Sequence, residues 1–310
     1  MTDGERSGEV SDGAITLAAL LAPVTLETFF ARYYEQRPLV VSAPRGGEAA
    51  LLSHGDLIDA LVDQQPHEHV LAFPSRLRDG MEVRALLSDR GALTAYLDAG
   101  HPLVWNGARG AAAAVDFLSD ALAEAFGGNA WPNIYSTGGG GGPFKVHFDC
   151  HEVLAMQCEG QKEWRISSVR VDRPLHLDDV QGSVDAAMKA HAEEAAARTE
   201  LEATVGPGDV VYLPRGQFHT ARAIGGRSLH VSFGIQLLSG FEILRLVEQR
   251  AIADRTFRAC TPAAAADATG AAMKAYVDEL RRKLHSLIDE PGFLERAVAE
   301  RRRLVRAARR

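Results

Sequence analysis

The stretch KVHFDCHEVLAM, residues 145–156, decides the fold predicted for this chain. Its β-branched and apolar residues alternate with polar ones, which is typical of a β-strand. Residues i and i+2 of a strand lie on the same face of the sheet, so His147 and Asp149 are expected to point the same way. About 6.6 Å would separate them along the strand. The spacing therefore predicts that both side chains reach one metal ion.

A second imidazole ends the segment PRGQFH, residues 214–219. The residues before it, Asp209–Leu213, again have the pattern of a strand. Two imidazoles and one carboxylate form the ligand set that suits non-haem Fe(II) in oxygen chemistry. We therefore take His147, Asp149 and His219 as candidate metal ligands and catalytic residues, and we expect a metalloenzyme.

Composition excludes several classes of protein. The 310 residues are 46% hydrophobic, so disorder is not expected, and 34 basic against 41 acidic residues give a net charge of −7. This charge implies no general attraction to nucleic acid or to anionic membranes. No leader resembling a signal peptide and no apolar run of about 18 residues is found, which favours the cytoplasm and no membrane. Cys150, Cys158 and Cys260 show no CxxC spacing, which argues against a disulfide framework or a zinc finger.

The chain divides into four parts by pattern. Residues 1–14 are polar and predict a flexible terminus. Residues 15–130 mix helices and strands without visible chemistry and would pack on a barrel. The expected helices are Thr25–Gln36, Ser53–Val62, Val83–Leu97 and Ala111–Phe126, and the expected strands are Leu39–Ser42 and His101–Asn106.

Residues 131–239 are the candidate catalytic core, in which strands alternate with glycine and proline punctuation. Turns are predicted at residues 159–161, 206–209 and 225–226, and an alanine-rich helix at 186–197 interrupts the strands. The glycine run 138–142 has no following Lys-Ser/Thr, so it is not a phosphate-binding loop, and a flexible hairpin or lid is expected. Many short antiparallel strands predict a mainly β core with jelly-roll topology.

Residues 240–310 are predicted to be helical, with helices at Phe241–Thr256, Gly270–Leu287 and Gly292–Arg310. Their apolar stripes favour a dimerisation region and hence a homodimer. The last helix carries seven arginines. A solvated helix face explains them better than an RNA-binding element, because apolar residues also recur there at helical spacing.

Lys162 is the candidate anion-binding residue. It shares one predicted strand face with Trp164 and Ile166. A lysine that faces the interior would need an anionic partner, because an unpaired buried charge is unfavourable. The alternative is a surface lysine on the outer face.

The strings HFDCHEVLAMQCEGQKEWRI and GPGDVVYLPRGQFHTARAIGGRSLHVSFGI resemble the Jumonji C (JmjC) oxygenases of the bacterial cupin-4 and ribosomal-oxygenase type. The resemblance covers about residues 133–235 and extends weakly to FFARYYEQRPLVV, residues 29–41. It implies a double-stranded β-helix of the cupin kind that binds Fe(II). It also implies that 2-oxoglutarate and O2 serve as co-substrates for hydroxylation of a C–H bond.

The resemblance also assigns roles to single residues. His147, Asp149 and His219 fall on the metal triad of the family, and Lys162 falls on its basic residue for the co-substrate. Three weaker candidates for co-substrate binding, set against ordinary hydrogen bonding in the core, are Asn133, Tyr135 and Ser232. Two further histidines stay outside the set: His151, beside the metal or facing the substrate, and His230, expected in the core.

Three functions remain open. The favoured one is hydroxylation of a side chain in a protein or peptide, for which ribosomal proteins are the family precedent. The second is the same chemistry on a small peptide or an amino-acid metabolite, as in a tailoring enzyme. The third is a cupin isomerase or binding protein without oxygenase activity. Such cupins usually present His-x-His with a separate glutamate, and Asp149 argues against that class.

Overall fold

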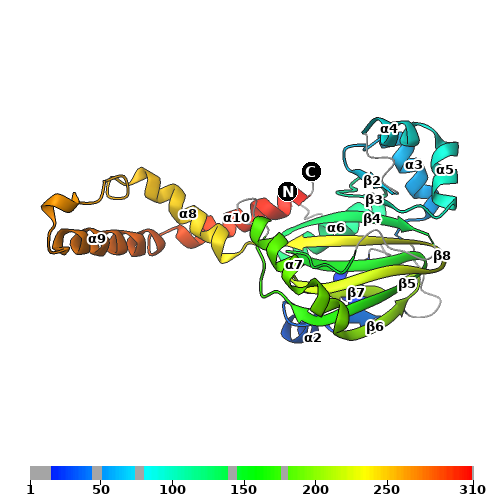
Figure 1. Ribbon diagram of the computed structural model, residues 1–310, viewed down its shortest axis with the longest axis horizontal. Coiled ribbons are helices and arrows are strands. Elements are labelled where there is room, and N and C mark those ends of the chain that lie inside the picture. The colour runs from blue at the N-terminus through cyan, green and yellow to red at the C-terminus, as the bar shows by residue number, and fades with distance from the viewer. Residues whose placement is uncertain (1–14, 44–50, 74–79, 139–144, 176–180, 309–310) are drawn as a thin grey trace, which may run out of the picture.

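The computed structural model describes residues 15–43, 51–73, 80–138, 145–175 and 181–308 (Figure 1). The expectations for residues 1–14 and for most of the glycine run 138–142 lie outside these ranges. Eight strands pair antiparallel in the order β1-β7-β5-β8-β4-β3-β2, with β6 added to β5. Their bounds are β1 Leu39–Val41, β2 Val70–Ala72, β3 Leu103–Trp105, β4 Asn129–Thr137, β5 Glu152–Arg170, β6 Thr199–Val205, β7 Val210–Leu213 and β8 Gln217–Gln236. The mainly β core and its double-stranded β-helix are thereby confirmed.

Two long strands, β5 and β8, run through the whole barrel, and the turns predicted at residues 159–161 and 225–226 are wrong. Both strands continue through their glycines, with bulges where Glu159 pairs with Leu229 and Gln161 pairs with Ile224. Gly160 has φ +66°, and a Cβ there would lie 2.1 Å from the carbonyl oxygen of Arg227. The glycines therefore bend the strands and do not reverse them.

The strand predicted for residues 145–156 begins only at Glu152. His147 forms an isolated bridge with His219, and residues 148–151 have no regular structure. The prediction that His147 and Asp149 share one face of a regular strand is thus wrong. Backbone hydrogen bonds to Gly216, just before β8, and to His219 in β8 position these two residues instead.

Several helices begin directly after a capping residue, and some of their ends differ from the predicted bounds. They are α1 Leu17–Leu21, α2 Leu26–Arg32, α3 His54–Gln64, α4 Gly80–Ser88, α5 Arg90–Asp98, α6 Ala113–Phe126, α7 Gln181–Ala197, α8 Gly240–Ala253, α9 Ala271–Ile288 and α10 Phe293–Ala308, with a 3₁₀ turn at Ala264–Ala266. The single helix predicted at 83–97 is two helices. Asp89 separates them because its carboxylate accepts hydrogen bonds from the backbone N–H groups of Gly91 and Ala92, which starts α5. The helix predicted at 25–36 ends early, at Arg32.

Three buried apolar clusters occur among the described residues; the smallest packs Phe148 and Phe218 against Ala195 of α7, and the other two hold the sheet. The larger one lies between the sheet and the helices α1, α2, α3 and α6, and in it Phe29 packs edge to face on Tyr212, with ring centroids 4.8 Å apart. The smaller one fills the barrel and includes Val153, Trp164 and Ile166. Burial of each such side chain contributes roughly 1.5–3 kcal/mol. The inner cluster forms part of the wall around the candidate site.

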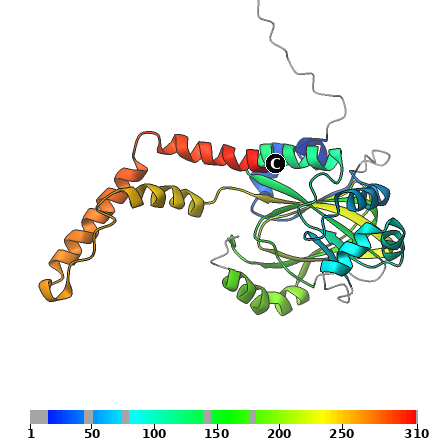
Figure 2. The same ribbon diagram turned by 90° about the horizontal axis from the view of Figure 1, so that it is seen from above.

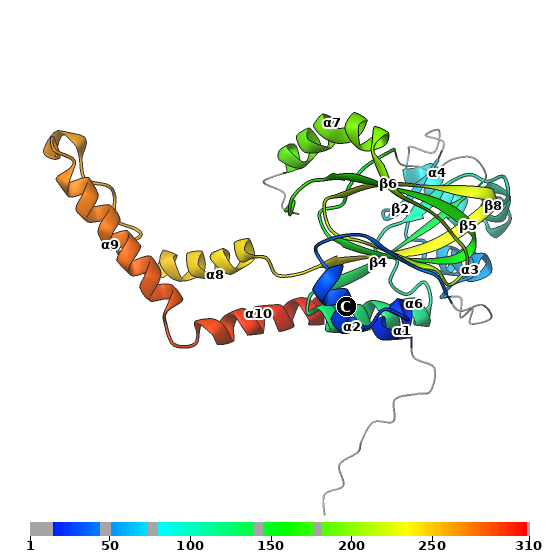
Figure 3. The ribbon, with the colours of Figure 1, turned by 90° about the horizontal axis from the view of Figure 1, so that it is seen from below.

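The carboxy-terminal helices form an arm that leaves the barrel after β8 (Figures 2 and 3). Helices α8 and α9 extend away from the barrel, and α9 has no buried residue. Helix α10 returns and packs against α6 and β4. The side chain of Arg301 donates a hydrogen bond to the carbonyl oxygen of Gly127, over 3.2 Å. Within the described ranges, no helix is long and apolar enough to cross a membrane.

The predicted four-part division stays a prediction. Strands β1, β2 and β3, from the part before residue 131, belong to the same sheet as the core. Helix α7 lies between β5 and β6, where an insertion was expected.

Candidate metal centre

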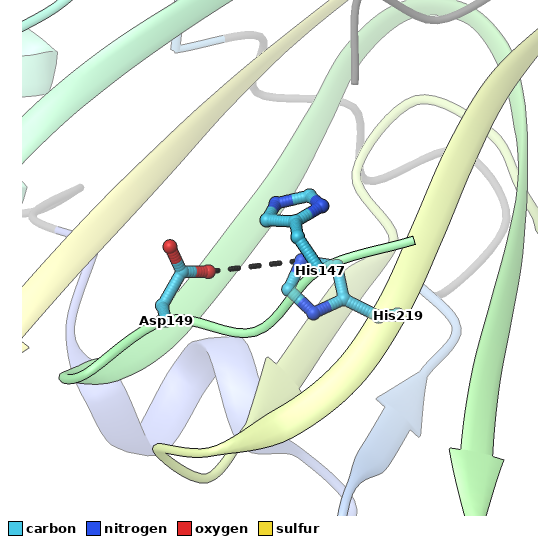
Figure 4. Close-up of side chains that lie close together, drawn as sticks. All are labelled: His147, Asp149 and His219. Atoms are coloured by element: carbon cyan, nitrogen blue, oxygen red, sulfur yellow. Dashed lines mark ion pairs between the residues drawn. The ribbon is translucent and has the colours of Figure 1, made fainter. Parts of the chain in front are cut away.

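The side chains of His147, Asp149 and His219 converge at the mouth of the barrel (Figure 4). Each offers one possible ligand atom, and these atoms all lie within 4.8 Å of one another. Nε2 of His219 is 3.7 Å from Oδ2 of Asp149, and the two imidazole centroids are 4.4 Å apart. One divalent cation could contact all three groups after small side-chain rotations.

Backbone hydrogen bonds to β8 and to the glycine before it hold the irregular segment that carries His147 and Asp149. The backbone amide of each histidine donates to the carbonyl oxygen of the other, over 3.1 Å from His147 and 2.8 Å from His219. The amide of Gly216 donates to the carbonyl oxygen of Asp149, over 2.7 Å. A Cβ at Gly216 would lie 2.0 Å from the carbonyl oxygen of Val171, so only glycine permits this close approach. The loop is therefore fixed although it is not a strand.

Both imidazoles have their tautomer set by a backbone carbonyl two residues earlier. Nδ1 of His147 lies 2.8 Å from the carbonyl oxygen of Lys145, and Nδ1 of His219 lies 2.9 Å from that of Gln217. A carbonyl oxygen only accepts, so each Nδ1 carries a proton and Nε2 is the ring nitrogen that can face a metal ion. Metal-binding histidines are usually oriented in this way.

The protonation states also suit a cation. Burial, and to a smaller extent the neighbouring His147, lower the pKa of His219 to about 4. Burial opposes ionisation of Asp149, but the surrounding histidines His151, His219 and His147 together hold its pKa below the usual range. At neutral pH, His219 is thus a neutral imidazole and Asp149 a carboxylate, which are the forms that bind a metal.

A cavity of about 50 Å³ leads inward from these residues. Apart from the three candidate ligands, its wall consists of Tyr135, Val153, Lys162, Trp164, Ala221, His230 and Ser232. Trp164 stacks on His219, with centroids 5.7 Å apart. The wall therefore combines apolar side chains with a few polar groups, which is typical of a site that orients a small ligand.

Lys162 lies inside the barrel and not on its outer face, since the residue is only 2% exposed. Its Nζ is 2.5 Å from Nδ1 of His230, and burial lowers the pKa of its ammonium group to about 7. Among the described residues, no carboxylate lies within ion-pair distance of it. A buried ammonium group without an anion fits a cavity that binds a carboxylate ligand.

The other predicted residues divide into two groups. Tyr135 and Ser232 line the cavity, as expected for contact with a bound ligand. Asn133 does not line it, and its side-chain oxygen accepts a hydrogen bond from the amide of Gly107, over 3.0 Å. A role for Asn133 in ligand binding stays a prediction that this geometry does not support.

His230 lies in the core, as expected, since the residue is only 5% exposed, but it has a further place that the sequence analysis did not assign. It lines the cavity and contacts Lys162. The signal was present in the sequence, because His230 precedes Ser232 by two residues on the same strand and so shares its inward face.

His151 and Cys150 line a second cavity, of about 210 Å³. The ring of His151 packs edge to face on Trp131, with centroids 4.8 Å apart. Burial raises the pKa of the Cys150 thiol to about 11, so this thiol is not a ready nucleophile. Glu35, Glu152 and Arg215 contribute polar groups to the same cavity.

Comparison with known proteins gives a consistent result. Residues 113–243 match the model of the JmjC domain. A bifunctional lysine-specific demethylase and histidyl-hydroxylase, NO66, from Drosophila mojavensis is 24% identical over 262 residues, which are 80% of this chain and 28% of that protein. Ribosomal oxygenase 2 from Bos taurus is 32% identical over 145 residues, 44% of this chain and 29% of that protein. The chain thus spans less than a third of either relative.

Solved structures support the fold. The ribosomal oxygenase YcfD from Escherichia coli superposes with a TM-score of 0.56 at 16% identity, covering 88% of this chain and 68% of that one. A second structure of YcfD, in complex with cobalt and 2-oxoglutarate, superposes with a TM-score of 0.55 and covers 86% of this chain and 68% of that one, also at 16% identity. The matched domain, the double-stranded β-helix and the convergent histidines and aspartate agree, and they identify residues 113–243 of this chain as a JmjC domain.

Proposed function

We propose that this protein is an Fe(II)- and 2-oxoglutarate-dependent dioxygenase that hydroxylates a side chain of a protein or peptide. The observation that carries the proposal is one cavity with a two-histidine, one-carboxylate cluster at its mouth and a buried lysine within it. A ligand with a 2-oxo acid group at one end and a carboxylate at the other suits both features. The complex of YcfD with cobalt and 2-oxoglutarate supports this proposal.

His147, Asp149 and His219 would hold the iron, and they leave positions open for other ligands, as such sets do. Bound iron supplies the activation of O2 that amino-acid side chains cannot provide. Lys162 would donate to the distal carboxylate of 2-oxoglutarate, with Tyr135 and Ser232 as further donors from the neighbouring strands. Val153 and Trp164 would keep bulk water from the inner part of the cavity.

The second cavity supports a substrate larger than a free amino acid. Its volume of about 210 Å³ exceeds the 50 Å³ of the cavity that contains Lys162. Its lining includes Cys150 and His151, which directly follow Asp149. A peptide could place one side chain at the metal while a neighbouring residue occupies this second space. The named activities of the relatives, ribosomal oxygenase and histidyl-hydroxylase, favour a protein substrate as well.

We further propose that the arm mediates homodimerisation. Apolar side chains on α8 and α9 are exposed in the single chain, including Leu244 at 50%, Ile252 at 63% and Val277 at 52%. A second copy could cover them.

The test of homodimerisation is light scattering of a variant with Leu244→Glu and Val277→Glu, with Arg245→Glu, beside Leu244 on α8, as the control. A monomeric wild-type protein would contradict the proposal. Truncation is a poorer test because it also removes α10, which packs on α6.

The proposed activity is tested by mass spectrometry. The protein is incubated with Fe(II), 2-oxoglutarate and a cell extract or a peptide library, and products are examined for the gain of one oxygen. The matched control is Asp149→Ala. A gain of oxygen on peptides that depends on Asp149 supports the proposal. Turnover with free amino acids that equals turnover with any peptide would instead favour the tailoring enzyme, and the absence of 2-oxoglutarate turnover would favour a cupin without oxygenase activity.

A further inference from the structure

The imidazole of His230 is fixed on two sides by aromatic rings. It stacks on Tyr135, with centroids 4.7 Å apart and an interplanar angle of 8°. It meets Trp164 edge to face at 5.8 Å, and the residue is only 5% exposed. Tyr135 pairs with His230 across β4 and β8, so the backbone register itself produces the stack. The ring therefore has little freedom to rotate.

The hydrogen-bond chemistry fixes the role of each nitrogen in this contact. Nδ1 of His230 is 2.5 Å from Nζ of Lys162. The charged form of Lys162 only donates, so with this form Nδ1 must accept and the proton of the neutral ring must lie on Nε2. Burial first, and then the charge of Lys162, lower the pKa of His230 well below its ordinary value. The ring thus stays a neutral acceptor at physiological pH.

A neutral acceptor has an advantage over a carboxylate at this position. A carboxylate would neutralise Lys162 and repel an incoming anion, whereas an imidazole directs the ammonium group and leaves its charge available. The flexible stem of a lysine otherwise has to be ordered when the ligand binds, which weakens affinity. A rigid partner removes part of that penalty before binding.

We propose that His230 is a positioning residue that holds the Lys162 ammonium group ready for the distal carboxylate of the co-substrate. The inference rests on the proposed function, since it assumes that 2-oxoglutarate occupies this cavity. It assigns to His230 no contact with the metal. His230 would thus raise the affinity and selectivity of the cavity for a dicarboxylate, and would not change the affinity of the metal site.

The test compares wild type with His230→Leu and His230→Asn, loaded with Mn(II) and kept free of O2. Calorimetry measures the Kd of 2-oxoglutarate and of 2-oxovalerate, which lacks the distal carboxylate. We expect His230→Leu to bind 2-oxoglutarate at least about 10-fold more weakly, with unchanged Kd for 2-oxovalerate and for Mn(II). Asn places its side-chain oxygen near the position of Nδ1 and is expected to restore most of the affinity. His101→Leu, at a histidine outside the cavity, is the control.

The outcomes separate the two ideas. If wild type binds 2-oxoglutarate and His230→Leu binds it equally well, the inference is overturned and the proposed function stands. Equal losses for both ligands would mean a merely structural role and also overturn the inference. Failure of wild type to bind 2-oxoglutarate overturns both. If His230→Leu does not fold, ¹⁵N NMR of wild type at pH 6, where Lys162 is charged, decides: a proton on Nδ1 contradicts the inference, and a proton on Nε2 alone supports it.

Discussion

Replacement of Lys162 by methionine is expected to weaken co-substrate binding while it stabilises the free protein. Methionine nearly conserves the volume and removes the charge. A charge-assisted hydrogen bond is worth about 1.5–3 kcal/mol, so the Kd of 2-oxoglutarate is expected to rise by a factor of about 12–160. The metal affinity is expected to stay unchanged, because the Lys162 side chain contacts His230 and, among the described residues, has no hydrogen bond to a candidate metal ligand.

The stability change follows from the pKa of the buried ammonium group. Burial lowers this pKa from 10.5 to about 7, which corresponds to a destabilisation of up to about 5 kcal/mol at pH 7 and below. Between pH 7 and 10.5 the unfolded chain keeps a proton that the folded protein releases, so wild type gains stability as pH rises. The advantage of Lys162→Met over wild type is therefore greatest at low pH and disappears towards pH 10.5.

Two measurements on the same proteins check this reasoning. Urea denaturation without co-substrate, at several pH values from 6 to 10, gives the stability difference, and calorimetry gives the Kd. Lys189→Met, at an exposed lysine of α7, is the control and is expected to change neither. A variant less stable than wild type at pH 6.5, or one with an unchanged Kd for 2-oxoglutarate, would refute the account of Lys162.

Two further predictions concern the metal ligands and the bend in β5. His219→Ala is expected to reduce bound Mn(II) from about one ion per chain to a small fraction, because one of three ligands is lost; elemental analysis after dialysis measures this, and full occupancy would remove His219 from the site. Gly160→Ala is expected to destabilise the protein by several kcal/mol more than Gly225→Ala does. Both glycines have positive φ, of +66° and +69°, but only at Gly160 would a Cβ meet backbone, the Arg227 carbonyl oxygen. Equal melting temperatures for the two variants would contradict this explanation of the bend.

The chemistry of the site could be predicted from the sequence because it depends on residue types and on alternation within regular strands. Trp164 and Ile166 lie inward with Lys162, as parity predicted, since the second half of β5 is a regular strand. Local pattern also indicated the strands on either side of the glycines. These features are set by interactions between near neighbours in the chain.

The errors arise where contacts distant in sequence override the local pattern. Residues 148–151 alternate like a strand, but hydrogen bonds to Gly216 and His219 hold the segment in another form. Gly160 and Gly225 lie in segments whose residues are typical of turns. Strands β5 and β8 nevertheless continue through them, because β5 pairs with β6, β7 and β8, and β8 pairs with β4 and β5. No single-sequence signal reveals such pairing. His230 was correctly expected in the core, but its place in the cavity wall was not assigned, because a lone histidine carries little information about its role.

The most direct test of the central claim is a crystal structure grown without O2, with Mn(II) in place of iron and with 2-oxoglutarate. We predict one anomalous peak at about 2.0–2.2 Å from each of His147, Asp149 and His219. The distal carboxylate of 2-oxoglutarate is predicted to lie within hydrogen-bond distance of the Lys162 ammonium group. A metal ion elsewhere, or a 2-oxoglutarate molecule bound outside this cavity, would contradict the account.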